Sequence, residues 1–398
     1  MTQNGAENAP IGLGIAGLGM AGAVMVHAAA AHPGYSLRAA ADPHAAPREA
    51  FARDHNARAY SDVSMLVADP AVEAVYIATP HQFHREHAVL AAQHGKHVIL
   101  EKPMALTLGD CDAIVEAAER RKVTLIVGHT HAFDPNVRLM RRIIAGGELG
   151  PLGMIHSFNY TNFLYRPRRP EELDTAKGGG ILFNQVPHQI DTVRLLAGGL
   201  VRSVRASASV LDSARPTEGS CAALLQFEGG VAASLVYSGY DHFDADEWHF
   251  GIGERGAPKA IDHGAARRAL AHVDDETRSR TETFAYGSGS AAMPPHQPHF
   301  GITIATCARG DLRASADGVT IYGQGGMREV PIERGEGMPG RREALDDMRA
   351  AIRFGRRPVH DGRWGKATLE VALAILQSTR EGREVMLEHQ VAVDGSPG

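Results

Sequence analysis

Short apolar runs alternate with amphipathic stretches along residues 11–130. Runs that are apolar at every position fit parallel strands buried on both faces, and apolar residues at helical spacing fit the crossover helices between them. The predicted strands are Ile11–Ala16, Ser36–Ala41, Ala74–Ala78, His97–Leu100 and Val123–Val127, and the predicted helices are Gly22–Ala31, Asp62–Val67, Phe83–His94 and Gly109–Arg121. This alternation predicts an α/β domain with a doubly wound parallel sheet.

The pattern changes after His129, where successive strands joined by short turns replace the alternation. The predicted elements are helices at Asp134–Ala145 and Leu182–Leu196, strands at Val201–Val210, Cys221–Phe227 and Val231–Tyr237, and helices at Gly340–Phe354 and Lys366–Glu381. For residues 240–300 the pattern of apolar and polar positions predicts no regular element. We therefore expect two domains, residues 1–131 and an α+β domain of residues 132–398 with a largely antiparallel open sheet and C-terminal helices within 340–381.

Composition and charge narrow the class of protein. The 398 residues are 44% hydrophobic and 22% charged, as in folded globular proteins. The net charge is −5 and no long Lys/Arg run occurs, so we expect no nucleic-acid partner. The uncharged stretch from Asn8 to Leu37 is interrupted by glycines, His and Pro, so we expect no membrane segment. Cys111, Cys221 and Cys307 are widely spaced, which fits free thiols in the cytoplasm.

A glycine-rich turn follows the first predicted strand and opens a helix. Its sequence is Gly17-Leu18-Gly19-Met20-Ala21-Gly22, the G-x-G-x-x-G pattern of a Rossmann dinucleotide site. The first glycine permits the tight turn, the second lets the backbone reach the pyrophosphate, and the third lets helix and strand pack closely. Asp42 ends the second strand, where a carboxylate binds the adenosine ribose and repels a 2′-phosphate. We therefore expect NAD rather than NADP as the cofactor.

Five motifs in order resemble those of the Gfo/Idh/MocA family, whose members are two-domain NAD(P)-dependent oxidoreductases. They are Ala78–His84, Gly95–Pro103, Gly147–Gly153, Gly178–Asp191, and Ile352–Pro358 with Ser378–Val385. The resemblance implies that Lys102 lies beside the nicotinamide and hydrogen-bonds the reacting hydroxyl or carbonyl. By the same resemblance Glu101 reaches the nicotinamide ribose, and Thr79, Pro80 and His84 line the cofactor. A strand-end ammonium would also stabilise a developing alkoxide.

His188 is the second candidate for proton transfer, because a neutral imidazole can accept a hydroxyl proton. The family usually places Asp one helical turn before this His, and here the position is Asn184. An amide exchanges no protons, so Asn184 can only orient the substrate, and proton transfer falls to His188 or Lys102. Asp191 either orients the His188 ring or is an ordinary surface acid.

Two further clusters have alternative interpretations. His129 and His131 alternate at a strand end and could form a metal pair, but no third ligand has a convincing spacing and hydride transfer needs no metal, so we expect none. Arg166, Arg168 and Arg169 lie upstream of the Gly178 segment. They form either a solvated basic loop or a clamp for an anionic substrate, because guanidinium groups bind carboxylates through paired hydrogen bonds.

These features together predict a hydride transfer between a secondary carbinol of a cyclic, polar small molecule and nicotinamide. The Asn184 segment resembles the branch of the family that includes 4,5-dihydroxyphthalate dehydrogenases, which oxidise a cis-dihydrodiol with NAD. A sugar or inositol dehydrogenase and a non-catalytic nucleotide-binding regulator remain as alternatives. An open sheet with helices on one face leaves an apolar face, so we also expect a homodimer or homotetramer.

Overall fold

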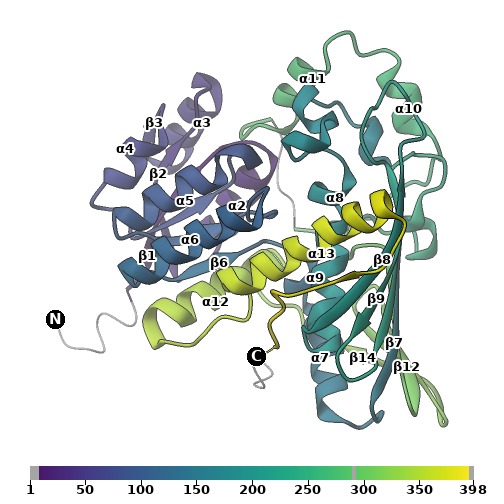
Figure 1. The fold of residues 1–398 in the computed structure, drawn as a ribbon. Coiled ribbons are helices and arrows are strands. Elements are labelled where there is room, and N and C mark those ends of the chain that lie inside the picture. Colours follow the sequence, from purple (N-terminus) through teal and green to yellow (C-terminus); the bar gives the residue numbers. More distant parts are fainter. Residues whose placement is uncertain (1–8, 289–292, 394–398) are drawn as a thin grey trace. The chain divides into compact units, whose positions relative to one another are not determined.

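The computed structural model describes residues 9–288 and 293–393. Its described residues divide into two compact units (Figure 1). The first unit is drawn from Met1–His129, Arg278–Met293 and Glu336–Lys366, and the second from Thr130–Thr277, Pro294–Gly335 and Ala367–Gly398.

The first unit is built on a parallel sheet with the strand order β3-β2-β1-β4-β5-β6. Its strands are β1 (Ile11–Ala16), β2 (Tyr35–Ala41), β3 (Arg58–Tyr60), β4 (Ala74–Ile77), β5 (His97–Leu100) and β6 (Leu125–Val127). Every residue of the central strands β1 and β4 is buried, as the continuous apolar runs predict. The order reverses between β1 and β4, and such a switch point is where doubly wound sheets bind ligands.

Helices connect these strands, and side chains cap two of them. They are α2 (Met20–Ala30), α3 (Ala45–His55), α4 (Val63–Ala68), α5 (His84–Gln93) and α6 (Leu108–Arg121), joined in this unit by most of α11 (Glu276–Phe284), by α12 (Arg341–Phe354) and by the start of α13 (Gly362–Glu381). The Asp62 carboxylate accepts from the Ser64 N–H and caps α4, and the Thr107 hydroxyl caps α6. Helix α3 and strand β3 were not predicted, because their residues are partly polar and exposed.

The second unit contains a mixed sheet with the order β14-β13-β12-β11-β7-β10-β9-β8-β15. Its strands are β7 (Leu152–Tyr160), β8 (Val201–Ser209), β9 (Ser220–Phe227), β10 (Ala232–Ser238), β11 (Ile302–Cys307), β12 (Gly310–Ala314), β13 (Gly318–Gly323), β14 (Gly326–Pro331) and β15 (Val385–Met386). Among the strands that the structure describes in this sheet, β7 and β10 pair in parallel and the remaining pairs are antiparallel. The predicted fold class, a Rossmann domain with a largely antiparallel α+β domain, is confirmed.

Helices α7 (Pro135–Gly146) and α9 (Val186–Ala197) lie against one face of this sheet (Figure 1). The predicted helix Leu182–Leu196 is interrupted at Gln185: α8 (Ile181–Asn184) ends before it, and α9 begins at Val186 with Pro187 in its first turn. Proline has no N–H for an intrahelical bond, so the chain starts a new helix there. Helix α10 (Ala265–Leu270) lies in the stretch for which no element was predicted.

The two compact units differ from the predicted domains, residues 1–131 and 132–398, in three places. The first boundary falls after His129, and Arg278–Met293 and Glu336–Lys366 join the first unit. For α12 the physical reason is packing on the Rossmann sheet and its helices. The Tyr35 hydroxyl donates to the Leu345 carbonyl at 2.7 Å, and Arg353 forms an ion pair with Glu73. Across the described residues, no helix is both long enough and apolar enough to cross a membrane.

Candidate functional site

The three glycines of the G-x-G-x-x-G turn take the roles expected of them. Gly17 has a φ of +92°, and a Cβ there would lie 2.6 Å from the Ala78 carbonyl oxygen. A Cβ on Gly22 would lie 1.8 Å from the Gly17 oxygen, so helix and turn approach too closely for any side chain. Gly19 has no atom within 4 Å of its Cβ position and caps α2. The turn is therefore closed on two sides and open at Gly19, where an anion can approach the helix N-terminus.

Asp42 lies at the end of β2 and contacts this turn directly. Its Oδ2 accepts from the Leu18 N–H at 2.8 Å, and its Oδ1 accepts from the His44 N–H at 2.9 Å. Asp42 as a whole residue is 8% exposed. It is thus fixed by two backbone amides beside the turn, at the position where a Rossmann acid meets the adenosine ribose.

The residues expected to line the cofactor follow β4 and β5, and one of them, His84, is the first residue of α5. The Glu101 carboxylate accepts from the Tyr76 hydroxyl and from the Lys102 N–H, the latter at 3.1 Å. The fully buried His84 ring lies 2.8 Å from the Pro103 oxygen and 2.9 Å from the Thr79 oxygen, and burial lowers its pKa. The His84 ring therefore lies between the Thr79-Pro80 and Lys102-Pro103 loops, and in its neutral form it donates a hydrogen bond to one of the two carbonyls. Lys102 is half-buried after β5.

In the second unit, His188 lies in the first turn of α9 and is 7% exposed. Its ring centroid is 4.8 Å from that of His131 and 4.8 Å from that of Phe300. The Phe300 ring also stacks on Tyr237, whose hydroxyl donates to the Gln185 Oε1 at 3.1 Å. His188 is thus held in an aromatic wall formed by residues from four separate stretches of the chain.

His131 is the cationic member of this wall. Its Nδ1 lies 2.6 Å from Asp134 and its Nε2 lies 3.5 Å from Glu254. Burial alone would lower the pKa of His131, but the two carboxylates outweigh it and raise the pKa to about 9. The same contacts, opposed by burial, hold the pKa of Glu254 below its usual range. A charged imidazolium therefore lies next to the His188 ring at neutral pH.

Asn184 and Asp191 have roles the sequence did not predict. The Asn184 amide donates to the carbonyls of Gly178 and Gly180, at 3.1 and 2.8 Å, and so fixes the turn before α8. Asp191 is 1% exposed and accepts from the hydroxyls of Thr130 and Thr368. It is therefore a buried acceptor and not a surface acid.

The three arginines of the loop separate into different environments. Arg168 is 5% exposed, and its Nε and Nη2 both donate to the Phe163 carbonyl, at 3.0 and 2.6 Å. Its guanidinium also stacks on the Phe163 ring and pairs with Glu172. Arg169 pairs with Glu171 and Glu172. Both side chains thus make protein contacts that hold the loop.

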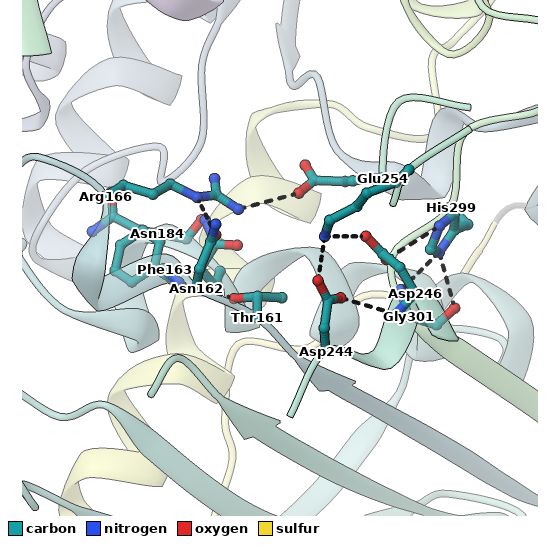
Figure 2. A network of polar contacts seen from close by, with 12 residues as sticks. Thr161, Asn162, Phe163, Arg166, Asn184, Asp244, Asp246, Glu254, His299 and Gly301 are labelled. Atoms are coloured by element: carbon teal, nitrogen blue, oxygen red, sulfur yellow. Dashed lines mark hydrogen bonds and ion pairs between the residues drawn. The ribbon is translucent and has the colours of Figure 1, made fainter. Parts of the chain in front are cut away.

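Arg166 differs from its two neighbours. Its Nε donates to the Asn162 Oδ1 at 2.7 Å, and its Nη2 lies 3.9 Å from Glu254 (Figure 2). Because Glu254 also contacts His131, a chain of polar contacts runs from Arg166 to the neighbour of His188. Sequence reasoning missed Glu254, Phe300 and Tyr237, since they lie far from the recognised motifs and carry no local signal.

The arrangement of His129 and His131 does not support the alternative that they form a metal pair. The boundary between the two units falls between these residues, and His131 is bound to carboxylates. Within residues 9–288 and 293–393, no group of three or more His, Cys, Asp or Glu residues is arranged to hold a metal ion.

Comparison with known proteins identifies the architecture. Residues 11–129 match the family model for the Gfo/Idh/MocA oxidoreductases with an NAD-binding Rossmann fold, and residues 137–257 match the Gfo/Idh/MocA C-terminal domain. The chain belongs to the Gfo/Idh/MocA family. It is accordingly an NAD-dependent oxidoreductase, as the G-x-G-x-x-G turn and the motif around Lys102 predicted.

Individual members of the family add detail. The chain is 40% identical over 353 residues to the 1-carboxy-3-chloro-3,4-dihydroxycyclohexa-1,5-diene dehydrogenase of Comamonas testosteroni, covering 86% of this chain and 88% of that protein. It is 33% identical over 155 residues to the myo-inositol 2-dehydrogenase of Thermotoga maritima, covering 39% of this chain and 45% of that protein. A crystal structure described as a putative dehydrogenase from Bordetella bronchiseptica superposes with a TM-score of 0.92 at 46% identity, covering 95% of this chain and 100% of that one.

Proposed function

We propose that this protein oxidises a carboxylated cyclic cis-dihydrodiol with NAD. The observation that carries the proposal is the chain of contacts in the second unit, which links Arg166 through Glu254 and His131 to His188. It joins a guanidinium suited to a carboxylate and an imidazole suited to a hydroxyl proton in one wall. The similarity to the Comamonas dehydrogenase, whose name describes a carboxylated dihydroxycyclohexadiene, supports the same substrate class.

Each site residue takes a role that its chemistry allows. When bound, NAD would supply the hydride acceptor for the carbinol carbon, and the Gly17–Gly22 turn and Asp42 would hold it. Lys102 stabilises the oxygen as negative charge develops, and the hydroxyl proton passes to His188 or to Lys102. The neighbouring His131 carries a positive charge, which favours a neutral, proton-accepting His188. Asn184 is a positioning residue in this scheme, since its amide holds the Gly178–Gly180 turn.

Arg166 is the member of the arginine loop that we assign to the substrate carboxylate. The buried donors of Arg168 point to the Phe163 carbonyl, and Arg169 is paired with two glutamates. The Arg166 side chain keeps 26% of its surface exposed and holds only one hydrogen bond shorter than 3 Å among those described. If its guanidinium turns to an anionic ring, it gives up the Asn162 hydrogen bond and the 3.9 Å contact with Glu254, and both are only part-buried.

Turnover assays decide between this substrate and the carbohydrate alternative. Purified protein is given NAD and a panel of cis-dihydrodiols with and without ring carboxylates, myo-inositol and common aldoses, and nicotinamide absorbance is followed. We expect turnover of the carboxylated diols. Turnover confined to inositol or aldoses would overturn the proposal and favour the activity named for the Thermotoga relative.

We also propose that the protein is a homo-oligomer joined through the sheet of the second unit. Helices α7 and α9 cover one face of this sheet. On the other face Met154, Leu224 and Trp248 are 38%, 44% and 50% exposed, and Phe158 contacts the Trp248 ring. An apolar patch of this kind favours association with a second copy. Light scattering of the wild type and of Leu224→Glu tests the proposal, and a wild-type monomer would overturn it.

We also propose a cytoplasmic location. The three cysteines are free and buried, which is typical of proteins in a reducing compartment.

A further inference from the structure

A short segment after α11 contacts the phosphate-binding turn of the Rossmann domain. It lies beyond residue 257, where the match to the C-terminal family model ends. The Tyr286 N–H donates to the Leu18 carbonyl at 2.8 Å. Leu18 is the second residue of the G-x-G-x-x-G turn, more than 260 positions earlier in the chain. The contact lies wholly within the first unit.

The Tyr286 side chain fixes this contact by inserting between α2 and α3. The residue is 7% exposed, and its ring lies 5.5 Å from His27, 6.1 Å from Phe51 and 5.9 Å from His55. Its hydroxyl lies 2.8 Å from the His55 Nε2 and 3.3 Å from Asp54. The ring and the hydroxyl therefore anchor the segment at several points.

The protonation states of this cluster agree with that anchoring. Burial, with Asp54 nearby, raises the pKa of Tyr286 to about 12, so the phenol keeps its proton. Burial also lowers the pKa of His55, so its ring is neutral at pH 7. A neutral phenol can donate to Asp54 while it accepts from the His55 Nε2–H. The tyrosine hydroxyl is thus satisfied in both roles.

The consequence for the turn follows from the planarity of the peptide bond. In a trans peptide the carbonyl oxygen and the next N–H point in opposite directions, so holding the Leu18 oxygen fixes the Gly19 N–H. Asp42 holds the Leu18 N–H from the other side at 2.8 Å. Gly19 is the open position of the turn, with no atom within 4 Å of its Cβ site. Tyr286 therefore holds the Leu18–Gly19 peptide at its own carbonyl, and Asp42 holds the preceding Gly17–Leu18 peptide at its N–H.

We propose that Tyr286 is a positioning residue for NAD, and that residues 285–288 form a clasp that orients the Gly19 N–H toward the pyrophosphate. A donor that is already oriented loses less entropy when the anion binds. Removing the clasp leaves the turn free to sample other peptide orientations. We expect Tyr286→Ala to weaken NAD binding about 10-fold, the loss that corresponds to one well-placed hydrogen bond.

Direct binding tests this proposal without reference to the substrate. Calorimetric titration with NAD compares the wild type, Tyr286→Ala, Tyr286→Phe and the control Tyr322→Ala, whose tyrosine is 40% exposed on β13. We expect the largest loss for Tyr286→Ala, a smaller loss for Tyr286→Phe, which keeps the ring, and wild-type affinity for the control. Unchanged affinity in a folded Tyr286→Ala protein would overturn the clasp.

Ligand fragments separate positioning from general damage to the fold. ADP-ribose contains the pyrophosphate and adenosine does not, so Tyr286→Ala should weaken ADP-ribose as much as NAD and leave adenosine competition unchanged. Equal weakening of all three ligands would overturn the proposal, because it would indicate a disrupted domain. If the mutant is unstable without ligand, Asp54→Asn perturbs the same anchor more gently and should give a several-fold loss. Failure of the substrate proposal would leave these binding results intact.

Discussion

The ring of His131 lies 4.8 Å from the ring of His188 at an interplanar angle of 70°. Asp134 and Glu254 raise the pKa of His131 to about 9 against the effect of burial. One imidazole of this pair is thus held as a cation by two carboxylates, which makes a second proton on its neighbour unfavourable. In this pair His131 supplies a fixed positive charge, and His188 is the candidate proton acceptor.

The raised pKa of His131 predicts a pH dependence of stability. A histidine whose pKa rises from 6.5 in the unfolded chain to about 9 in the folded protein stabilises the fold fully below pH 6.5. That contribution is lost as the pH rises through about 9. We therefore expect the free energy of unfolding of the wild type to approach that of His131→Gln between pH 6.5 and 10. Urea unfolding of both proteins across this range measures it, and a constant difference would contradict the assignment.

The same charge predicts a change in the pH profile of turnover. Without the cation at position 131, His188 accepts a proton more readily, so the acid limb of kcat/KM should move to higher pH in His131→Gln. The measurement is kcat/KM from pH 5 to 9 at saturating NAD. Asp134→Asn offers a matched comparison, since it removes one carboxylate that holds the charge. An acid limb at the wild-type pH in His131→Gln would show that the two rings are not coupled.

Lys102 is tested by removing its charge while keeping its length. Lys102→Met should lower kcat by about 10²–10⁴ because it removes the ammonium that stabilises the developing alkoxide. NAD affinity, measured by titration, should stay within a few-fold of the wild type. Lys102→Arg keeps the positive charge and should recover part of the loss. Near-normal kcat in Lys102→Met would reject the role.

Asp42 determines the preference between the two nicotinamide cofactors in our interpretation. Asp42→Asn keeps an acceptor for the Leu18 N–H and removes the charge that repels a 2′-phosphate. We expect the ratio of NAD to NADP affinity to fall by about 10-fold. Titration with both cofactors gives this ratio, and unchanged discrimination would mean that another group selects the cofactor.

Arg166 and Arg168 should respond differently to truncation. Arg166→Ala should raise KM for a carboxylated diol by about 10- to 100-fold, the loss of a charge-assisted hydrogen bond, and barely change KM for the diol without the carboxylate. Arg168→Ala should instead destabilise the fold by about 1–3 kcal/mol, because it removes both Arg168 donors from the Phe163 carbonyl, while Glu172 keeps its contacts with Arg169. Equal KM effects on both diols in Arg166→Ala would place the carboxylate elsewhere.

Local pattern was sufficient where the contributing residues lie close together in the chain. The strand Ile11–Ala16, the turn Gly17–Gly22 and the acid Asp42 all have the predicted places, because each depends on backbone geometry and on the apolar character of one βα unit. The predicted helix across Gln185 was wrong as a single element, although Pro187 supplied a signal for the break. The strands β11 to β14 were missed: β14 is exposed, and β11 to β13 are only five or six residues long, too short for their alternation to be decisive.

The sequence by itself determined the Rossmann domain, its cofactor turn and the family to which the chain belongs, since these follow from short-range periodicity and contiguous motifs. Only the tertiary structure decided that Glu254 joins Arg166 to His131, that Phe300 lies against His188, and that Tyr286 holds Leu18. Each of these contacts joins residues more than 80 positions apart. Such contacts form only when packing of the core brings distant segments together, so local patterns in the sequence do not predict them.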